Sequence, residues 1–216
     1  MLEIGTGTGQ VTVPLARRGL AVTGVELGPA LAALCRQRLA GYPSCEVVVS
    51  AFEDWQPDGE PFGAVVAVNC LHWIDPQVQY AKPAALLRSG SAMVVGGCRW
   101  ARPADAGRFW TDVQEDYRAV GFEGEPPPPP AEITGWHFPL DALEFFTETA
   151  SLRYPFEWTY SADDYLAQLA TQAGTRALGA DGAADFLARV RHRLESLGSP
   201  RLSTTFVGQL TVGIRR

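Results

Sequence analysis

The chain has 216 residues, with 18 Lys and Arg against 24 Asp and Glu, which gives a net charge of −6 at pH 7. This length suits one α/β domain with an insertion. Because no basic stripe is visible, the chain lacks the electrostatic pattern of a nucleic-acid-binding protein. We find no apolar run of membrane-spanning length and no signal-peptide pattern, so we expect a cytoplasmic protein without membrane contact.

The first predicted element is a short buried strand over residues 2–4, which ends in glycines at alternate positions, Gly5, Gly7 and Gly9. A helix to about residue 18 follows, closed by Gly19. Glycine permits positive φ and a close approach of ligand to backbone, while a helix N-terminus favours electron-rich ligand atoms. The pattern predicts a ligand-binding turn, with a plain structural turn as the alternative.

A second strand over residues 20–26 ends in Glu26. This acid lies about 20 residues beyond the glycine turn, the spacing at which nucleotide-binding βαβ units place a carboxylate for ribose hydroxyls. The combination favours a nucleoside-containing ligand. The alternative is a solvated acid at the end of a strand.

Further strands are predicted at residues 45–49, 63–69 and 91–98, with a short helix near 84–87. A helix over residues 30–40 should bury one stripe, made of Leu31, Leu34, Cys35 and Leu39. This alternation of strand and helix predicts a parallel sheet with right-handed crossovers. Open sheets of this kind bind ligands at the carboxyl ends of their strands.

The second half of the chain changes character. We predict a helix over residues 109–120 and a stiff proline-rich connector over 125–131. A strand from Thr147 and a closing strand over 210–214 should pair antiparallel at the sheet edge, with two helices between them, the first capped by Ser161 and Asp164. The strand from Thr147 has an alternating apolar stripe that we expect to pack in the core, formed by Leu152, Tyr154, Phe156, Trp158 and Tyr160.

Four segments in this order resemble the class I S-adenosylmethionine-dependent methyltransferases, in their small-molecule branch, often called type 11. They are the glycine turn with Glu3, the acid Glu26, the segment 50–53 and the segment 69–73, Asn-Cys-Leu-His-Trp. The resemblance covers residues 1 to about 100 and the closing strands in outline. It implies a Rossmann-like, doubly wound α/β fold with a mostly parallel sheet and an antiparallel C-terminal edge strand. It also implies S-adenosyl-L-methionine as cofactor and a small-molecule methyl acceptor.

The resemblance assigns the methionine end of the cofactor to Glu3 and to the backbone of Gly5 and Gly7. Gly9 would permit close packing of the following helix. Glu26 would accept both ribose hydroxyls.

The adenine ring would lie against Leu27, Ala51 and Phe52. Members of the family commonly have an acid at or near the position of Ser50 to bind the adenine amine. Here that contact must come from Glu53 or be weak.

At the end of the fourth strand, the resemblance places Asn69 and Leu71 beneath the sulfonium, with His72 and Trp73 facing the acceptor. His72 is the candidate general base, because histidine exchanges protons readily near neutral pH. A structural hydrogen bond next to Trp73 is the alternative. Trp136 is a candidate for acceptor binding.

We interpret residues 1–216 as a single methyltransferase domain, a monomer or homodimer, in which residues 100–147 form an insertion that acts as a lid. Relatives usually have an N-terminal helix that closes over the cofactor, and the sequence begins at the first strand. We therefore weigh a non-catalytic or impaired cofactor-binding protein as an alternative.

A nicotinamide oxidoreductase is less favoured, because its G-x-G-x-x-G fingerprint needs a third glycine where Gln10 stands. We expect no metal site, because the four cysteines are scattered and lack ligand spacing.

Overall fold

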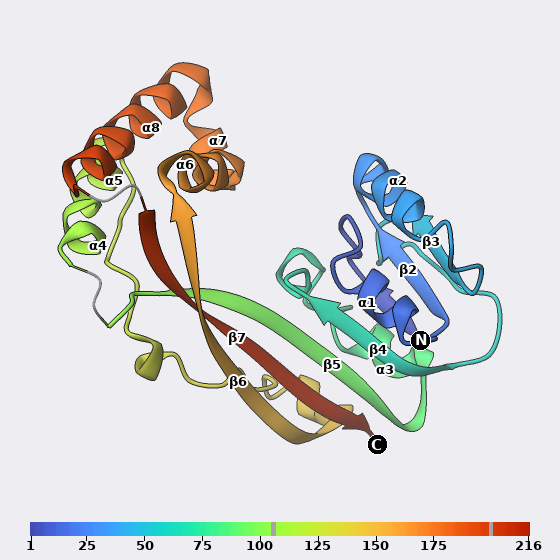
Figure 1. Ribbon diagram of the computed structural model, residues 1–216. Helices are drawn as coiled ribbons and strands as arrows, with labels where there is room; N and C mark the ends of the chain where they lie inside the picture. Colours follow the sequence, from blue (N-terminus) through green and yellow to red (C-terminus); the bar gives the residue numbers. More distant parts are fainter. Residues whose placement is uncertain (105–106, 199–200) are drawn as a thin grey trace. The chain divides into compact units, whose positions relative to one another are not determined.

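The computed structural model describes residues 1–104, 107–198 and 201–216, and the chain divides into two compact units (Figure 1). The first unit comprises Met1–Cys98, Gly135–Arg153 and Gln209–Arg216, and the second comprises Arg99–Thr134 and Tyr154–Gly208. The expected insertion at 100–147 is divided between the units, since its residues 100–134 belong to the second unit and its residues 135–147 to the first. Its action as a lid stays a prediction.

Within the described ranges, seven strands form one sheet in the order β3-β2-β1-β4-β5-β7-β6. Their bounds are β1 Leu2–Ile4, β2 Val22–Glu26, β3 Cys45–Val49, β4 Phe62–Val68, β5 Leu87–Ala101, β6 Phe146–Ser161 and β7 Arg201–Arg215. The first five strands pair in parallel, whereas β7 and β6 run in opposite directions at the edge (Figure 1). The predicted α/β fold is therefore confirmed. The edge strand is β6, and the C-terminal strand β7 lies between β5 and β6.

The helices are mostly short. Their bounds are α1 Thr12–Arg17, α2 Pro29–Arg38, α3 Ala81–Leu86, α4 Phe109–Asp112, α5 Gln114–Ala119, α6 Ala162–Thr171, α7 Ala173–Ala177 and α8 Gly179–Ser196, with 3-10 turns η1 Leu71–Trp73, η2 Pro130–Glu132 and η3 Ala142–Glu144. The helix expected over 109–120 is thus interrupted at Val113, between α4 and α5.

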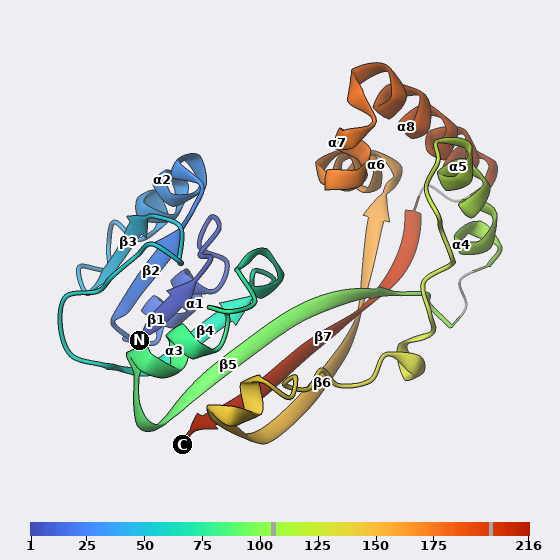
Figure 2. The ribbon, with the colours of Figure 1, turned by 180° about the vertical axis from the view of Figure 1, so that it is seen from behind.

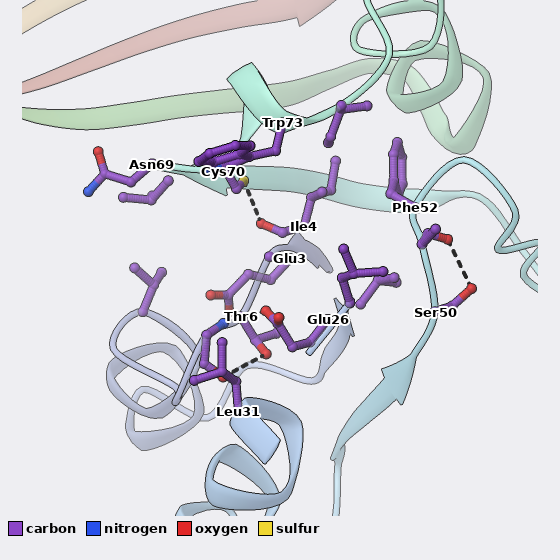
Figure 3. Close-up of a pocket in the computed structure, with 18 of the residues that line it drawn as sticks. Glu3, Ile4, Thr6, Glu26, Leu31, Ser50, Phe52, Asn69, Cys70 and Trp73 are labelled. Carbon is purple, nitrogen blue, oxygen red and sulfur yellow. Dashed lines mark hydrogen bonds between the residues drawn. The ribbon is translucent and has the colours of Figure 1, made fainter. Parts of the chain in front are cut away.

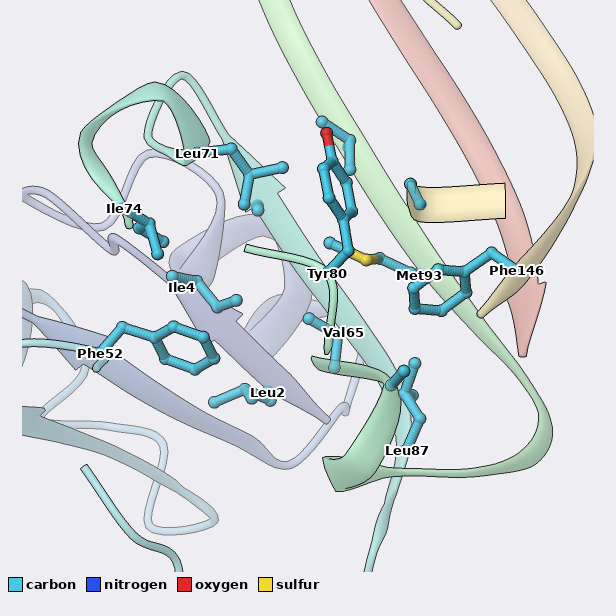
Figure 4. Packing of buried hydrophobic residues seen from close by; sticks show 14 of the residues in the cluster. Leu2, Ile4, Phe52, Val65, Leu71, Ile74, Tyr80, Leu87, Met93 and Phe146 are labelled. Atoms are coloured by element: carbon cyan, nitrogen blue, oxygen red, sulfur yellow. The ribbon is translucent and has the colours of Figure 1, made fainter. Parts of the chain in front are cut away.

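The core of the first unit forms around β1, the most central of the short strands. Leu2 and Ile4 are fully or almost fully buried and lie in register with Val65 and Ala67 of β4. Figure 4 shows these side chains packed with Phe52, Leu71, Tyr80, Leu87, Met93 and Phe146. Because β1 is covered on both faces, its position and the position of the turn after it are firmly set.

The predicted apolar stripe of α2 is only partly correct. Cys35 and Leu39 are buried, but Leu31 and Leu34 are 42% and 46% exposed, while Ala32 is completely buried. α2 packs against β2 and β3 (Figure 1). Its buried Ala32 and Cys35 belong to one apolar cluster with Val47 of β3. Leu31 instead borders the cavity described below.

The second unit has its own core. Tyr165 and Leu169 of α6 pack with Phe186 and Val190 of α8, and from behind these helices are seen together with α7 (Figure 2). The predicted cap of α6 is confirmed, because the Ser161 side chain accepts a hydrogen bond from the Asp164 amide at 3.1 Å.

The expected burial of the aromatic stripe on β6 is wrong for most of its length. Tyr154, Phe156 and Trp158 are 55%, 45% and 55% exposed, and Leu152 is 40% exposed. β6 is the outermost strand of the sheet, and its residues 153–159 are exposed on both faces. Alternation of large residues identified the strand correctly but did not reveal what covers it.

Candidate functional site

A cavity of about 500 Å³ lies at the carboxyl ends of β1, β2 and β4, and we call it the glycine-turn cavity (Figure 3). Nine of the eleven predicted cofactor-binding positions line it: Glu3, Gly5, Gly7, Glu26, Leu27, Ala51, Phe52, Glu53 and Asn69. Gly9 and Leu71 are not part of its lining. Trp73, a predicted acceptor-binding residue, borders it and is 77% exposed.

The glycines of the turn are required by conformation and by space. Gly5, Gly7 and Gly9 have φ values of +71°, +54° and +93°. A Cβ on Gly5 would lie 2.6 Å from the Cβ of Cys70, and a Cβ on Gly9 would lie 3.0 Å from the Sγ of Cys35. Gly9 therefore allows α2 to pack close to the turn, while Gly5 allows the segment after β4 to approach it.

Glu26 organises the backbone around the cavity. Its Oε2 accepts a hydrogen bond from the Gly7 amide, and its Oε1 accepts one from the Gly28 amide, both at 2.8 Å. The side chain ends β2 and is only 7% exposed. One carboxylate thus connects the glycine turn to the start of α2, with remaining lone pairs available for a ligand.

Glu3 is buried with an unpaired oxygen. The residue is 2% exposed, and among the described residues its Oε2 has no hydrogen-bond partner. Burial raises the pKa of Glu3 from 4.5 to about 7, an effect that hydrogen bonds from Thr12 oppose and the charge of Glu26 reinforces. An unpaired carboxylate oxygen at this depth is costly, so it favours a ligand that donates a hydrogen bond or carries a positive charge.

Lys82 holds the turn that forms one side of the cavity. From α3, its Nζ donates to the carbonyl oxygens of Phe52, Glu53 and Trp55 at 2.7, 2.9 and 2.5 Å. The same ammonium lies 5.1 Å from the centroid of the Phe52 ring. All three protons of the lysine are thereby used, which fixes the turn after β3. Sequence reasoning missed Lys82, because a single lysine on a short helix resembles a solvated residue.

The side chain of Glu53 is engaged with the protein. Its Oε1 accepts a hydrogen bond from the Asp75 amide at 3.0 Å. This bond connects the turn after β3 to the loop after η1. The predicted contact with the adenine amine stays a prediction and would use the other carboxylate oxygen.

Asn69 stands where β4 ends, and in the described part of the chain it alone among non-glycine residues has a positive φ, of +55°. Its amide donates to the Gly96 carbonyl at 2.9 Å, and its Oδ1 accepts from the Cys98 amide at 3.1 Å. A strained backbone held in this way is typical of binding sites. The next residue, Cys70, donates its thiol to the Ile4 carbonyl, and burial raises the pKa of this thiol to about 12, so it stays protonated.

A second cavity of about 310 Å³ adjoins the first, and we call it the His72 cavity. Asn69 and Cys70 line both cavities. The His72 cavity brings together the candidate base His72, the predicted acceptor contact Trp136, and Leu71. Residues that sequence reasoning did not select complete it, chiefly Gln79, Tyr80 and Gln209.

The polar groups of the His72 cavity are mostly neutral. Burial raises the pKa of Tyr80 to about 12, so its phenol keeps its proton. No Asp, Glu, Lys or Arg is found among the described residues that line this cavity. His72 is exposed, and the centroid of its ring lies 5.0 Å from that of Trp73. His72 lines the His72 cavity, whereas Trp73 lines the glycine-turn cavity.

The α/β sheet, the glycine turn and two acid-bearing strands are features of α/β domains that bind nucleoside cofactors. Comparisons with known proteins specify it further: residues 1–90 match the family described as "Methyltransferase domain". An uncharacterised methyltransferase of Mycobacterium tuberculosis is 29% identical over 126 residues, which are 58% of this chain and 48% of that protein. The chain thus spans about half the length of the curated relatives it matches first.

Solved structures agree in fold. A protein from Anaeromyxobacter dehalogenans assigned as a type II methyltransferase has a TM-score of 0.69 at 20% identity, covering 99% of this chain and 88% of that one. Geranyl diphosphate C-methyltransferase from Streptomyces coelicolor, solved with S-adenosyl-L-homocysteine, has a TM-score of 0.51 at 16% identity, covering 100% and 71%.

The resemblance drawn from the sequence is therefore confirmed. Residues 1–90 of the 216-residue chain match a methyltransferase domain, and the solved structures share its fold. In the described ranges, we find no helix with the length and apolar character needed to cross a membrane.

Proposed function

We propose that this chain transfers a methyl group from S-adenosylmethionine to a neutral small-molecule acceptor. The observation that carries the proposal is the pair of carboxylates, Glu3 and Glu26, at the ends of adjacent parallel strands in one cavity. A nicotinamide cofactor is not favoured by the methyltransferase match or by Gln10 at the third position of the fingerprint.

The residues of the glycine-turn cavity fit this cofactor. The unpaired Oε2 of Glu3 suits the ammonium of the methionine end, with the backbone of Gly5 and Gly7 beside it. Glu26 has lone pairs left for ribose hydroxyls after binding two amides. An adenine ring would lie against the apolar side chains that border the other end of the cavity, Leu27, Ala51 and Phe52.

When bound, S-adenosylmethionine supplies a methyl group that is already activated by a positively charged sulfur. The protein therefore mainly has to align the acceptor and exclude water. Asn69, which lines both cavities, is placed to border donor and acceptor alike. We assign Leu71, Trp73 and Trp136 to the apolar surface that orients the acceptor.

We assign His72 as the base that accepts a proton from the acceptor on one of its ring nitrogens. A base is needed when the attacking atom is a hydroxyl oxygen or an acidic carbon and is not needed for a neutral amine. The attacked atom, oxygen, nitrogen or carbon, is thus open. The neutral lining of the His72 cavity favours an uncharged acceptor, because an ion there would lose its hydration without a charged partner.

The test is isothermal titration of the purified chain with S-adenosylmethionine and S-adenosylhomocysteine, with NADH as control ligand. We expect micromolar binding of both sulfur ligands and none of NADH. Glu26→Ala should weaken binding about 100-fold, since it removes charge-assisted hydrogen bonds worth roughly 3 kcal/mol. Glu46→Ala, at an exposed acid of β3 outside the cavity, is the matched control and should bind like the wild type.

Binding of NADH but of neither sulfur ligand would contradict the proposal. If the Glu26→Ala variant binds both sulfur ligands as tightly as the wild type does, the glycine-turn cavity is not their binding site. Once binding is established, turnover should be screened with neutral phenols, alcohols and amines as acceptors.

A further inference from the structure

The second unit contains a cavity of its own, of about 260 Å³, which we call the aromatic cavity. Its lining comes from Trp100 of β5, from α4 and α5, from residues 123–127 and from α6. All of these residues belong to the second unit. The glycine-turn and His72 cavities, by contrast, are lined by residues of the first unit alone.

Three of the walls are aromatic rings at mutual contact distance. The ring centroids of Trp100, Trp110 and Tyr165 lie 6.0 to 6.1 Å from one another. Tyr117, a fourth lining residue, shares a side-chain hydrogen bond with Tyr165. The faces of such rings carry partial negative charge, and together they attract cations, above all alkylated ammonium groups that retain little hydration.

One polar group in this wall lacks a partner. Trp110 is 3% exposed, and its Nε1 makes no hydrogen bond to any of the residues that the structure describes. A buried indole N–H without an acceptor costs about 1–3 kcal/mol, and most such groups in proteins are paired. The Trp110 side chain lines the cavity, but its Nε1 is itself buried, so the indole has to shift at the cavity wall for a ligand oxygen to become its acceptor.

The rim of the aromatic cavity is acidic. Glu123 and Glu125 border it, both are exposed, and no Lys, Arg or His is found among its described lining residues. The acids precede the proline run, which starts at Pro126. The Arg102 amide, directly after β5, donates a hydrogen bond to the Pro128 carbonyl at 3.0 Å. Proline fixes its own backbone angle and restricts the residue before it, so Glu125 is held by the start of the proline run.

Size limits the ligand. The volume of about 260 Å³ is below the roughly 300–1,000 Å³ typical of sites for drug-sized molecules. Aromatic walls and two carboxylates select positive charge, and the free indole N–H selects an oxygen atom on the same molecule.

We propose that the aromatic cavity binds a small organic cation, an ammonium or methylated ammonium compound that also carries a hydroxyl or carbonyl oxygen. The cation lies against the rings of Trp100, Trp110 and Tyr165, with Glu123 and Glu125 neutralising its charge. Its oxygen accepts the hydrogen bond from Trp110. This site is independent of the methyl-transfer assignment, because it shares no lining residue with the other two cavities.

The experiment is isothermal titration of the full chain at pH 7.5 and low salt with three probes. Choline has the charge and the oxygen, tetramethylammonium has only the charge, and 3,3-dimethylbutan-1-ol is the neutral carbon analogue of choline. We expect choline to bind, tetramethylammonium to bind several-fold more weakly, and the neutral analogue to bind at least tenfold more weakly than choline. Equal binding of choline and its neutral analogue, or no binding of either cation, would overturn the proposal.

Variants separate the two contacts. Glu123→Gln/Glu125→Gln should weaken both cations about tenfold, whereas Glu157→Gln/Glu195→Gln, with the same charge change at exposed positions of the second unit, should change neither by more than twofold. Trp110→Phe keeps an aromatic face but removes the N–H, so it should weaken choline by a larger factor than it weakens tetramethylammonium. The proposal fails if both double variants act alike, because general charge would then explain the binding. Far-UV circular dichroism spectra of each variant, expected to match the wild type, show that the chain is folded.

Discussion

The glycine-turn cavity and the His72 cavity adjoin each other and share Asn69 and Cys70, yet they are built on different principles. The first is shaped by backbone conformation and contains two buried carboxylates, Glu3 and Glu26. The second is shaped by side chains, and its described lining contains no Asp, Glu, Lys or Arg. A cavity for a common cofactor needs fixed charges and fixed amides. A cavity for a particular acceptor depends on side-chain shape, which can change without altering the backbone.

The largest effect that separates the two cavities should come from Gly5→Ala. The new Cβ would lie 2.6 Å from the Cβ of Cys70, at a φ of +71°. Strain and overpacking together should lower the free energy of unfolding by about 3–4 kcal/mol and abolish cofactor binding. Chemical denaturation followed by tryptophan fluorescence measures the first effect.

Gly19→Ala is the matched control. Gly19 has a similar φ of +79°, but nothing lies within 4 Å of a Cβ built there, so this variant should lose only about 1 kcal/mol. If both variants lose the same stability, conformation alone accounts for Gly5 and its close contact with Cys70 has no energetic weight.

Glu3→Gln should remove a pH dependence of stability. Burial raises the pKa of Glu3 from 4.5 to about 7, so below pH 4.5 the carboxyl is protonated in both folded and unfolded chains. As the pH rises to 7, the unfolded chain loses the proton first, and the wild type loses about 3 kcal/mol that the Gln variant keeps. Denaturation at pH 5 and pH 8, with both proteins compared, measures the difference.

Ligand affinity should show the opposite sign. A cationic ligand group beside Glu3 stabilises the ionised carboxylate, so the affinity for S-adenosylmethionine should rise between pH 5.5 and 7.5 and then level off. Glu3→Gln should flatten this profile. An identical pH profile in both proteins would contradict the placement of a ligand cation at Glu3.

His72→Gln acts on the second cavity. If His72 is the base, kcat for a hydroxyl acceptor should fall about 100-fold, since general base catalysis contributes at least that much. The dissociation constant of S-adenosylmethionine should stay unchanged, because His72 does not line the glycine-turn cavity. An unchanged kcat, with the slope of its pH profile also unchanged, would assign His72 a structural role.

Lys82→Met should affect the cofactor alone. Three carbonyl oxygens in the turn after β3 would lose their donor, and the Phe52 ring would lose the ammonium beside it. We expect affinity for S-adenosylmethionine to fall about tenfold, the equivalent of roughly one charge-assisted hydrogen bond. Lys82→Arg should restore part of it. Methionine, a fragment that lacks adenosine, serves as a competing ligand. If Lys82→Met lowers the affinity for methionine as much as the affinity for S-adenosylmethionine, the effect is not confined to the adenine end.

Most of the selected residues line the first cavity because its determinants are local. Glycines at alternate positions require a turn, and Glu26 ends a strand whose bounds follow from its apolar residues. The second cavity combines residues 69–72, 79–80, 95–97, 136 and 209, which no short motif connects. Burial of the β6 stripe was predicted wrongly for a related reason: alternation reveals a strand, but what packs on that strand is decided by segments far away in the chain.

Trp136→Ala should give the smallest and most selective effect. The backbone of Trp136 is held independently of its ring, because its carbonyl accepts hydrogen bonds from the Ser151 and Thr211 hydroxyls at 2.7 and 2.5 Å. Loss of the ring should therefore enlarge the His72 cavity without moving the chain, and raise the KM of an aromatic acceptor about fivefold. Titration of S-adenosylmethionine should give the wild-type affinity. A loss of cofactor affinity with an unchanged acceptor KM would mean that the two cavities are coupled through Asn69 and Cys70. A change in the lining of one cavity would then alter binding in the other.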